Sequence, residues 1–311
     1  MVKIEVEHFT KDYGFGRGVF DISFQIHDGE VYGFLGPNGS GKSTTIRHLM
    51  GFSKPDKGHT RIMGMDTFNN YHKFMDKVGY LPGEIALPDG LTGYEFIDMM
   101  KHLKKVKDER YIKYLCDLFE LDPSGETKRM SLGVKRKLAI VTAFMHDPDI
   151  LILDEPTSGL DLKMQQVFID FIKKEKQRGK TILLSSHIFS EIDATCDRIA
   201  IIKEGKIVAE FYANDLKHSK NKNYDIEFNS IADLMAFRNA NDNSDKFTII
   251  NQDNNHLLIN INDENINYLI KALSLIQFRG FSQLKETLED YFMKFYKEDR
   301  DFGGAIQWKK S

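Results

Sequence analysis

Short apolar runs alternate with stretches of helical periodicity along the N-terminal part of the chain. The segments VYGFLG (31–36), ILILD (150–154) and TILLSS (181–186) read as strands buried on both faces, as in a parallel sheet. Amphipathic helical patterns follow the first two, in STTIRHLMGF (43–52) and MQQVFIDFIKKEKQRGK (164–180). This strand–helix–strand alternation predicts an α/β fold with a mainly parallel sheet.

The remaining N-terminal segments have simpler patterns. In MVKIEV (1–6) and DISFQI (21–26), apolar and polar residues alternate, which predicts half-buried strands. Residues 91–120 and 132–146 have helical periodicity. We therefore expect strands at the start of the first domain and a group of helices inside it.

The composition changes near residue 217. HSKNKN (218–223) is a plausible linker, and the segment after it is rich in Asn and Asp. The patterns beyond it predict a small α+β domain, 218–311, with the order β-α-β-β-α-(β)-α, after a first domain of residues 1–217. Residues 301–311 show no periodicity. The last predicted helix places five apolar side chains on one face: Leu284, Leu288, Tyr291, Phe292 and Phe295.

Charge and composition exclude several classes of protein. The chain has 43 Lys and Arg against 46 Asp and Glu, a net charge of −3, which argues against nucleic acid as a partner. The densest basic stretch is residues 128–137, and we interpret its Lys135-Arg136-Lys137 as the polar face of a helix. Two cysteines cannot form a disulfide framework. No apolar run is long enough to span a membrane and no signal-peptide core is present, so we expect a soluble intracellular protein.

A glycine-rich loop follows the first buried strand and precedes a helix. GPNGSGKST (36–44) fits the pattern G-x-x-x-x-G-K-[ST], whose backbone N–H groups cradle nucleotide phosphates. Lys42 would reach the β- and γ-phosphates, and the Ser43 hydroxyl could ligate Mg²⁺. The predicted nucleotide-binding residues of this loop are Gly36, Asn38, Gly39, Ser40, Gly41, Lys42, Ser43 and Thr44.

Polar side chains end the next two buried strands. Asp154 and Glu155 follow ILIL, at the sheet edge where the phosphate loop also lies. Asp154 could hold Mg²⁺ through water, and Glu155 could polarise an attacking water as a general base. His187 follows TILLSS and could hydrogen-bond the γ-phosphate, although a lone histidine is more often structural.

Taken together, residues 1–215 resemble the nucleotide-binding subunits of ABC transporters. GPNGSGKST matches the Walker A motif of that family and ILILDE matches Walker B with its catalytic glutamate, while His187 matches the switch histidine. SGLD (158–161) is similar to the D-loop, which implies that Asp161 lies at a dimer interface. Tyr13 matches the aromatic residue that stacks on adenine.

Two motifs depart from the family pattern. The signature, usually LSGGQ, is MSLGV (130–134) here: it keeps the phosphate-contacting Ser131 and Gly133 but lacks the glutamine. The Q-loop position, usually Gln, is Gly83, and the neighbouring Glu84 could replace it as a Mg²⁺ ligand or could be a solvated loop residue.

The resemblance implies a fold, cofactors and partners. The fold would be a P-loop NTPase with a RecA-like parallel sheet, an N-terminal antiparallel β subdomain and a helical subdomain at about 84–146. ATP and Mg²⁺ would bind between two nucleotide-binding subunits, identical or different, that meet head to tail. The last helix is similar to those of ABC-2-type exporter ATPases. Such a subunit works with separately encoded integral membrane permease subunits at the cytoplasmic face of the membrane, and its cargo is a drug, an antimicrobial peptide, a lipid or a polysaccharide.

Three other functions remain open at this stage. A soluble ABC-type ATPase acting on ribosomes generally has two motif sets, and a DNA-repair type has long coiled coils or zinc cysteines. A small-molecule kinase leaves MSLGV, SGLD and His187 unexplained. A non-catalytic or weakly active regulatory subunit is made conceivable by Gly83, but the intact Lys42 and Glu155 argue against it.

Overall fold

The structure, a computed structural model, describes residues 1–217, 220–242, 244–284 and 287–297. The chain divides into two compact units, Met1–Ala213 and Asn214–Ser311. The linker expected at 218–223 is shorter than predicted, because the first strand of the second unit begins at Asn221. Residues 218–219 and the aperiodic stretch 301–311 lie outside the described residues.

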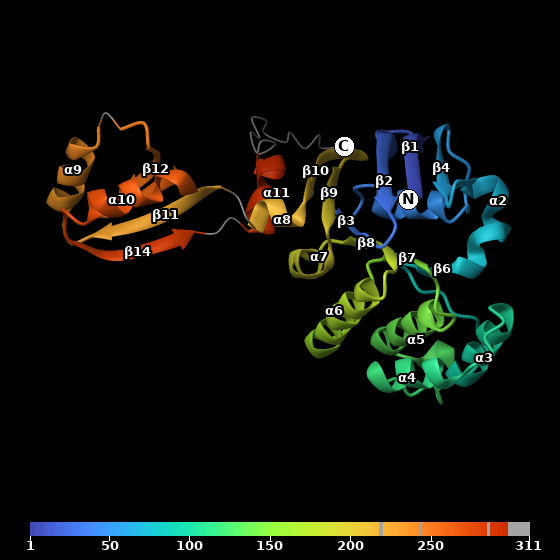
Figure 1. Cartoon of the computed structure of the whole chain (residues 1–311). Coiled ribbons are helices and arrows are strands. Elements are labelled where there is room, and N and C mark those ends of the chain that lie inside the picture. The colour runs from blue at the N-terminus through green and yellow to red at the C-terminus, as the bar shows by residue number, and fades with distance from the viewer. Residues whose placement is uncertain (218–219, 243, 285–286, 298–311) are drawn as a thin grey trace, which may run out of the picture. The chain divides into compact units, whose positions relative to one another are not determined.

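The first unit is built around a six-stranded sheet with the order β10-β9-β3-β8-β7-β6 (Figure 1). All neighbours in it are parallel except the edge pair β9 and β10. This confirms the mainly parallel sheet, and both β3 and β7 are buried along their whole length, as their apolar sequences predict. The strands are β3 (Val31–Leu35), β6 (Val78–Leu81), β7 (Ile150–Asp154), β8 (Thr181–Ser186), β9 (Arg198–Lys203) and β10 (Lys206–Tyr212).

A second, antiparallel sheet in the order β2-β1-β4-β5 forms the predicted N-terminal β subdomain. Its alternating apolar side chains pack into one core with the larger sheet: Phe24 of β2, for example, stacks on Tyr32 of β3 with ring centroids 5.1 Å apart. The strands are β1 (Val2–Asp12), β2 (Gly18–His27), β4 (Lys57–Ile62) and β5 (Met65–Asp66).

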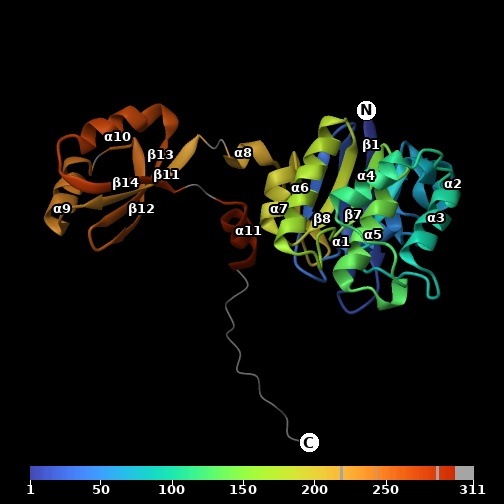
Figure 2. The same ribbon diagram turned by 90° about the horizontal axis from the view of Figure 1, so that it is seen from below.

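Helices connect the strands of the large sheet. Figure 1 shows α3, α4 and α5 grouped away from the antiparallel sheet, which is the predicted helical subdomain, and Figure 2 gives the view from below. Thr92 and Glu95 form a reciprocal capping box at the start of α3. The helices are α1 (Lys42–Leu49), α2 (Thr67–Phe74), α3 (Gly93–Leu103), α4 (Arg110–Leu118), α5 (Leu132–Phe144), α6 (Leu162–Gln177) and α7 (Phe189–Thr195), with short 3-10 turns at Met75–Lys77 and Thr127–Arg129.

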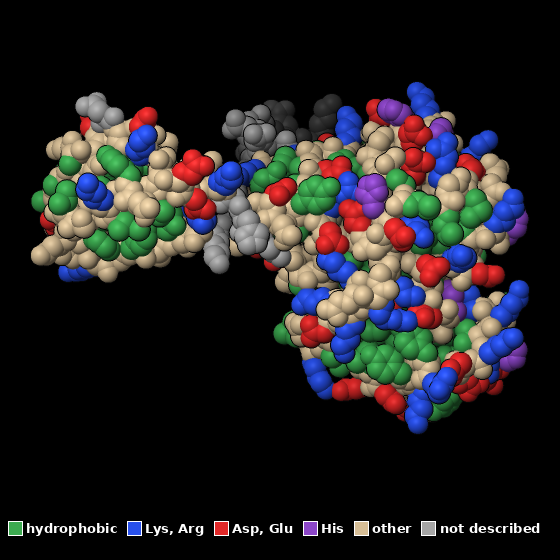
Figure 3. All heavy atoms as spheres, viewed as in Figure 1, with side chains coloured by type: hydrophobic (Ala, Val, Ile, Leu, Met, Phe, Trp, Pro, Cys, Tyr) green, Lys and Arg blue, Asp and Glu red, His purple; other side chains and the backbone are tan. Residues whose placement is uncertain are grey.

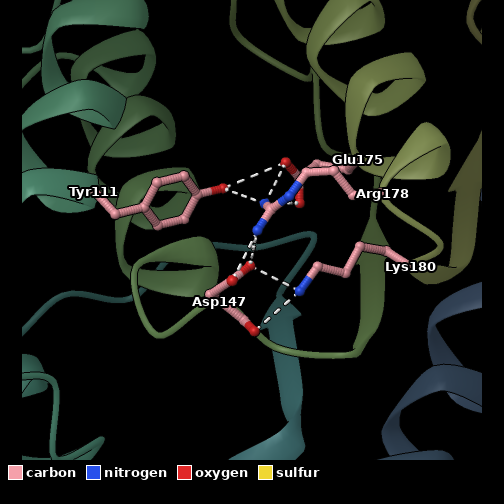
Figure 4. A network of polar contacts seen from close by, with 5 residues as sticks. All are labelled: Tyr111, Asp147, Glu175, Arg178 and Lys180. Carbon is pink, nitrogen blue, oxygen red and sulfur yellow. Dashed lines mark hydrogen bonds and ion pairs between the residues drawn. The ribbon is translucent and has the colours of Figure 1, made fainter.

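A polar network ties α4 to the end of α6 and the start of β8 (Figure 4). Arg178 donates to both carboxylate oxygens of Glu175, at 2.9 and 3.0 Å, and to both of Asp147, at 2.8 Å. Tyr111 of α4 donates to Glu175 at 3.4 Å, and Lys180 lies 2.7 Å from Asp147. Because Glu175 is only 3% exposed, the network holds a buried carboxylate where the helical subdomain meets the sheet.

The second unit is a β-α-β-β-α-β module followed by a helix, the order that the sequence predicts. Its four antiparallel strands have the ferredoxin-like order β12-β13-β11-β14. Side chains from α9 and α10 share one core with β11 and β13. The elements are α8 (Ala213–Lys217, at the division), β11 (Asn221–Phe228), α9 (Ile231–Ala240), β12 (Phe247–Asp253), β13 (His256–Asn262), a 3-10 turn (Asp263–Asn265), α10 (Ile266–Leu273), β14 (Phe278–Leu284) and α11 (Leu288–Lys297).

One detail of the last helix was predicted wrongly. Leu284 is not on its apolar face but ends β14, where it pairs with Asn223 of β11. The helical periodicity extends by chance into the preceding strand, and hydrogen bonding to β11 fixes the extended conformation there. Leu288 and Phe292 do lie on α11 and are buried.

Candidate active site

The glycine-rich loop begins where β3 ends and leads directly into α1. A Cβ atom at Gly36 would lie 2.5 Å from the carbonyl oxygen of Ile202, so no other residue fits there. Gly39 and Gly41 have φ angles of 81° and 111°, which glycine adopts without strain. These three glycines let the loop curl around the N-terminus of α1, which is the geometry that phosphate binding requires.

The three predicted catalytic side chains meet beside this loop. The Lys42 ammonium donates to the Gly36 carbonyl at 2.6 Å and lies 3.0 Å from Oε1 of Glu155. The other carboxylate oxygen of Glu155 lies 2.6 Å from Nδ1 of His187. Glu155 has a φ of 48°, an uncommon conformation for a residue other than glycine and one that clusters at functional sites. A carboxylate, a cation and an imidazole are thus brought together at the phosphate loop.

Asp154 lies next to this cluster at the end of β7. Its carboxylate is 3% exposed and accepts a 2.5 Å hydrogen bond from the Ser185 hydroxyl. The backbone of Gly83 runs against it, since a Cβ atom there would lie 3.0 Å from Oδ2 of Asp154. Glu84 is exposed. Backbone therefore borders the carboxylate where the family pattern would put a glutamine side chain.

The donor atoms here suit Mg²⁺. Asp154 and the Ser43 hydroxyl are oxygen donors, the type of ligand that this ion prefers. Within the described part of the chain, no group of three or more His, Cys, Asp or Glu side chains could hold a metal ion by itself. Few protein ligands are needed where substrate phosphates complete the coordination, so the site fits Mg²⁺ bound together with a nucleotide. A role for Glu84 stays a prediction.

A pocket of about 480 Å³ joins the phosphate loop to Tyr13, whose ring is 56% exposed in the loop between β1 and β2. Arg17, from the same loop, and Glu204, from the turn after β9, also line the pocket, and no sequence pattern indicated either of them. The lining residues are Tyr13, Gly16, Arg17, Gly18, Asn38, Gly39, Ser40, Gly41, Lys42, Ser43, Thr44, Glu155 and Glu204.

The signature and D-loop residues do not line this pocket. Ser131 is the N-cap of α5, and its hydroxyl accepts a hydrogen bond from the Val134 N–H at 3.3 Å. Asp161 caps α6 in the same way, accepting from Met164 at 2.9 Å. The two loops contact each other, since a Cβ atom at Gly133 would lie 3.0 Å from the carbonyl oxygen of Gly159.

The prediction that Lys135, Arg136 and Lys137 form the polar face of α5 is wrong for Arg136. Its side chain is 1% exposed and points into the protein, where it binds backbone carbonyl groups. A helix turns 100° per residue, so three consecutive basic residues cannot all face the solvent on a packed helix.

On the face seen in Figure 3, basic and acidic side chains are interspersed over the first unit.

A second buried charge also lacked a signal in the sequence. Glu191, in the first turn of α7, is 1% exposed, and burial raises its pKa to about 7. Hydroxyl groups of Ser186 and Thr157 lower this pKa, the negative charge of Glu155 raises it and the positive charge of Arg136 lowers it. Glu191 is therefore electrostatically coupled to the cluster around Glu155.

Comparison with known proteins agrees with this geometry. Residues 19–158 match the family model described as ABC transporter. The chain is 32% identical over 308 residues to the ABC transporter ATP-binding protein YhcH of Bacillus subtilis, covering 96% of this chain and 97% of that protein. It is 36% identical over 232 residues to the bacitracin transport ATP-binding protein BcrA of Bacillus licheniformis, covering 72% and 74%.

A solved ATP-binding subunit of an ABC transporter has the same fold, with a TM-score of 0.64 at 29% identity, covering 69% of this chain and 92% of that one. The full-length match to YhcH extends the similarity through the second unit. Together with the phosphate loop and the Lys42–Glu155–His187 cluster, these matches give the family. The chain belongs to the ABC transporter family, as an ATP-binding subunit that hydrolyses ATP.

Proposed function

We propose that this chain hydrolyses Mg²⁺-ATP in a dimer of nucleotide-binding subunits and thereby powers export through separate membrane permease subunits. The main support for the proposal is that the chain has one copy of each motif and that these motifs lie on two different surfaces. The pocket contains the phosphate loop, Tyr13 and Glu155, whereas Ser131 lies outside it. A complete site then needs Ser131 and Gly133 from a second subunit, with Asp161 near the interface.

The residues divide the chemistry among them. Tyr13 stacks on the adenine, and the loop N–H groups and Lys42 hold the phosphates. Glu155 orients and polarises the attacking water, and His187 keeps Glu155 in place and contacts the γ-phosphate. Ser43 and Asp154 would hold Mg²⁺, which would neutralise phosphate charge when bound. Phosphate oxygens compete with Glu155 for the Lys42 ammonium, so ATP binding would free the carboxylate for water.

The relatives support the proposed partners and cargo. A helix able to span a lipid bilayer is not found among the described residues. As a transporter ATP-binding subunit, like its relatives, the chain would act at the cytoplasmic face of the membrane, bound to permease subunits. BcrA is named for bacitracin transport, which supports a cargo among drugs, antimicrobial peptides or lipids for this chain as well. Copurification from membranes would identify the permease.

Glu155→Gln tests the proposal. The variant keeps the Lys42 and phosphate-loop contacts but loses the general base, so we expect normal ATP binding, a loss of turnover and an ATP-dependent dimer in size-exclusion chromatography. Lys42→Ala is the control, because it removes the phosphate contact and should abolish both binding and dimer formation. Wild-type turnover by Glu155→Gln, or a chain that stays monomeric with ATP, contradicts the proposal.

A further inference from the structure

Arg136 is the largest fully buried side chain among the described residues. It extends from the second turn of α5 and donates three hydrogen bonds, all to backbone carbonyl oxygens. Nη1 donates to Pro82 at 2.8 Å, Nη2 to Gly83 at 2.6 Å and Nε to Ser158 at 3.0 Å. One guanidinium therefore joins α5 to the loop after β6 and to the loop after β7.

The type of partner matters. Among the described residues, no carboxylate lies within 4.0 Å of Arg136. A buried cation is costly unless its donors are satisfied, and the planar fork of arginine suits several fixed acceptors at once. The charges of Asp154, Glu155 and Glu191 lie near enough to favour the cation without contacting it. Arg136 thus holds backbone carbonyl groups by hydrogen bonds, while its positive charge lies near the carboxylates of the site.

Both loops that Arg136 holds carry functional groups. The Gly83 backbone borders the Asp154 carboxylate, so a shift of this loop would change the surroundings of the predicted metal ligand. Ser158 follows Glu155 by one turn, and its N–H donates to the Glu155 carbonyl at 3.1 Å. This hydrogen bond links the backbone of Ser158 to that of Glu155, the predicted catalytic glutamate.

The signature loop contacts the same segment from the other side. A Cβ atom at Gly159 would lie 2.8 Å from Cγ of Leu132, the residue after Ser131. Leu132 and Arg136 both belong to α5, and they contact the adjacent residues Gly159 and Ser158. The start of α5 and the loop after Glu155 are thereby clamped at two neighbouring points.

We propose that Arg136 is a positioning residue for ATP hydrolysis. It holds the carbonyl groups of Gly83 and Ser158, and through them it sets Asp154 and Glu155 against the nucleotide and links them to Ser131 on the same helix. Gly83 has no side chain that could hold the loop after β6. In this chain, the Arg136 guanidinium holds this loop from inside the protein. The inference rests on the hydrolysis assigned to this site and does not depend on the cargo.

Arg136→Met and Arg136→Lys test this role, with Lys135→Met as the matched control on the neighbouring position of α5. Methionine keeps an unbranched chain but removes all three donors. We expect its kcat for ATP to fall about tenfold to hundredfold, since misplaced catalytic groups have effects of this size. The KM should change less than about threefold, because Arg136 does not line the nucleotide pocket. Arg136→Lys keeps the positive charge but loses the planar guanidinium, so its kcat should lie between those of the wild type and Arg136→Met. Lys135→Met should have the kcat of the wild type.

A kcat for Arg136→Met within threefold of the wild-type value overturns the proposal. So does a parallel loss of ATP affinity and of folded protein, measured by circular dichroism, in both Arg136 variants, because this would indicate a purely structural role. If Arg136→Met does not fold, a lower kcat at unchanged KM in Arg136→Lys still supports the proposal. Failure of the proposed function has a different signature, namely wild-type turnover by Glu155→Gln.

Discussion

Glu191 is a buried acid whose protonation should control the stability of the first unit. Among the described residues, neither of its carboxylate oxygens has a hydrogen-bond partner of good geometry. Burial is the largest influence on it and raises its pKa from the ordinary value of 4.5 to about 7. Glu191→Gln keeps the shape of the side chain and removes the titration.

The sign and size of the effect follow from proton linkage. Between pH 4.5 and 7, the folded chain keeps a proton on Glu191 that the unfolded chain has released. Stability contributed at low pH is therefore lost as the pH rises through this window. At about 1.36 kcal/mol per pKa unit, the wild type should lose about 2 to 3 kcal/mol of unfolding free energy from this group between pH 5 and pH 8. Glu191→Gln should not incur this loss.

The assay is urea denaturation of wild type and variant from pH 5 to pH 8 at constant ionic strength. The transition of the first unit is recognised because ATP raises its midpoint. We expect the stability of Glu191→Gln relative to the wild type to increase by about 2 to 3 kcal/mol across this range. Glu84→Gln, at an exposed position, is the control and should follow the wild type throughout. A difference between Glu191→Gln and the wild type that does not change with pH would refute the reasoning.

Two further predictions concern the loop after β6 and the network of Figure 4. Gly83→Ala should lower kcat roughly threefold to tenfold without loss of stability, because its methyl group would press on the predicted metal ligand. Gly125→Ala, which meets open space, should leave kcat unchanged, and equal rates in the two variants would contradict the crowding argument. Arg178→Ala should cost about 2 to 3 kcal/mol in urea denaturation, because Glu175 is buried and loses its cation. Arg110→Ala breaks an exposed pair and should leave the unfolding free energy close to the wild-type value. A similar cost in both variants would show that the network is not stabilising.

Local patterns of apolar and polar residues predicted most of the fold because they reflect which side chains are buried. Strands β3 and β7 are apolar on both faces and prove to be buried along their whole length. The β-α-β-β-α-β order of the second unit was likewise readable from alternation and turn residues. The end of the chain shows the limit: Leu284 fits a helical face in sequence, but hydrogen bonding to β11 places it in a strand.

The same contrast holds for the active site. Lys42, Glu155 and His187 lie at the ends of buried strands or in the phosphate loop, so topology alone brings them to one sheet edge. The positions of Arg17 and Glu204 in the pocket, and of the buried Arg136 and Glu191 beside the site, depend on how loops that are far apart in sequence pack together. No local spacing encodes such a contact, which is why the sequence indicated the predicted catalytic side chains and not the residues that support them.

The departures from the family pattern acquire a physical meaning in this setting. Gly83 removes a side chain, but its backbone then lies close against Asp154, and Leu132 in the signature packs on Gly159. In both places, close backbone packing occurs where the family pattern has a different residue. Backbone contacts of this kind keep their geometry only if the loops are held from outside, and Arg136 binds both loops. Losing the glutamine at position 83 therefore need not loosen the site, since the constraint acts on main-chain atoms through a single buried cation.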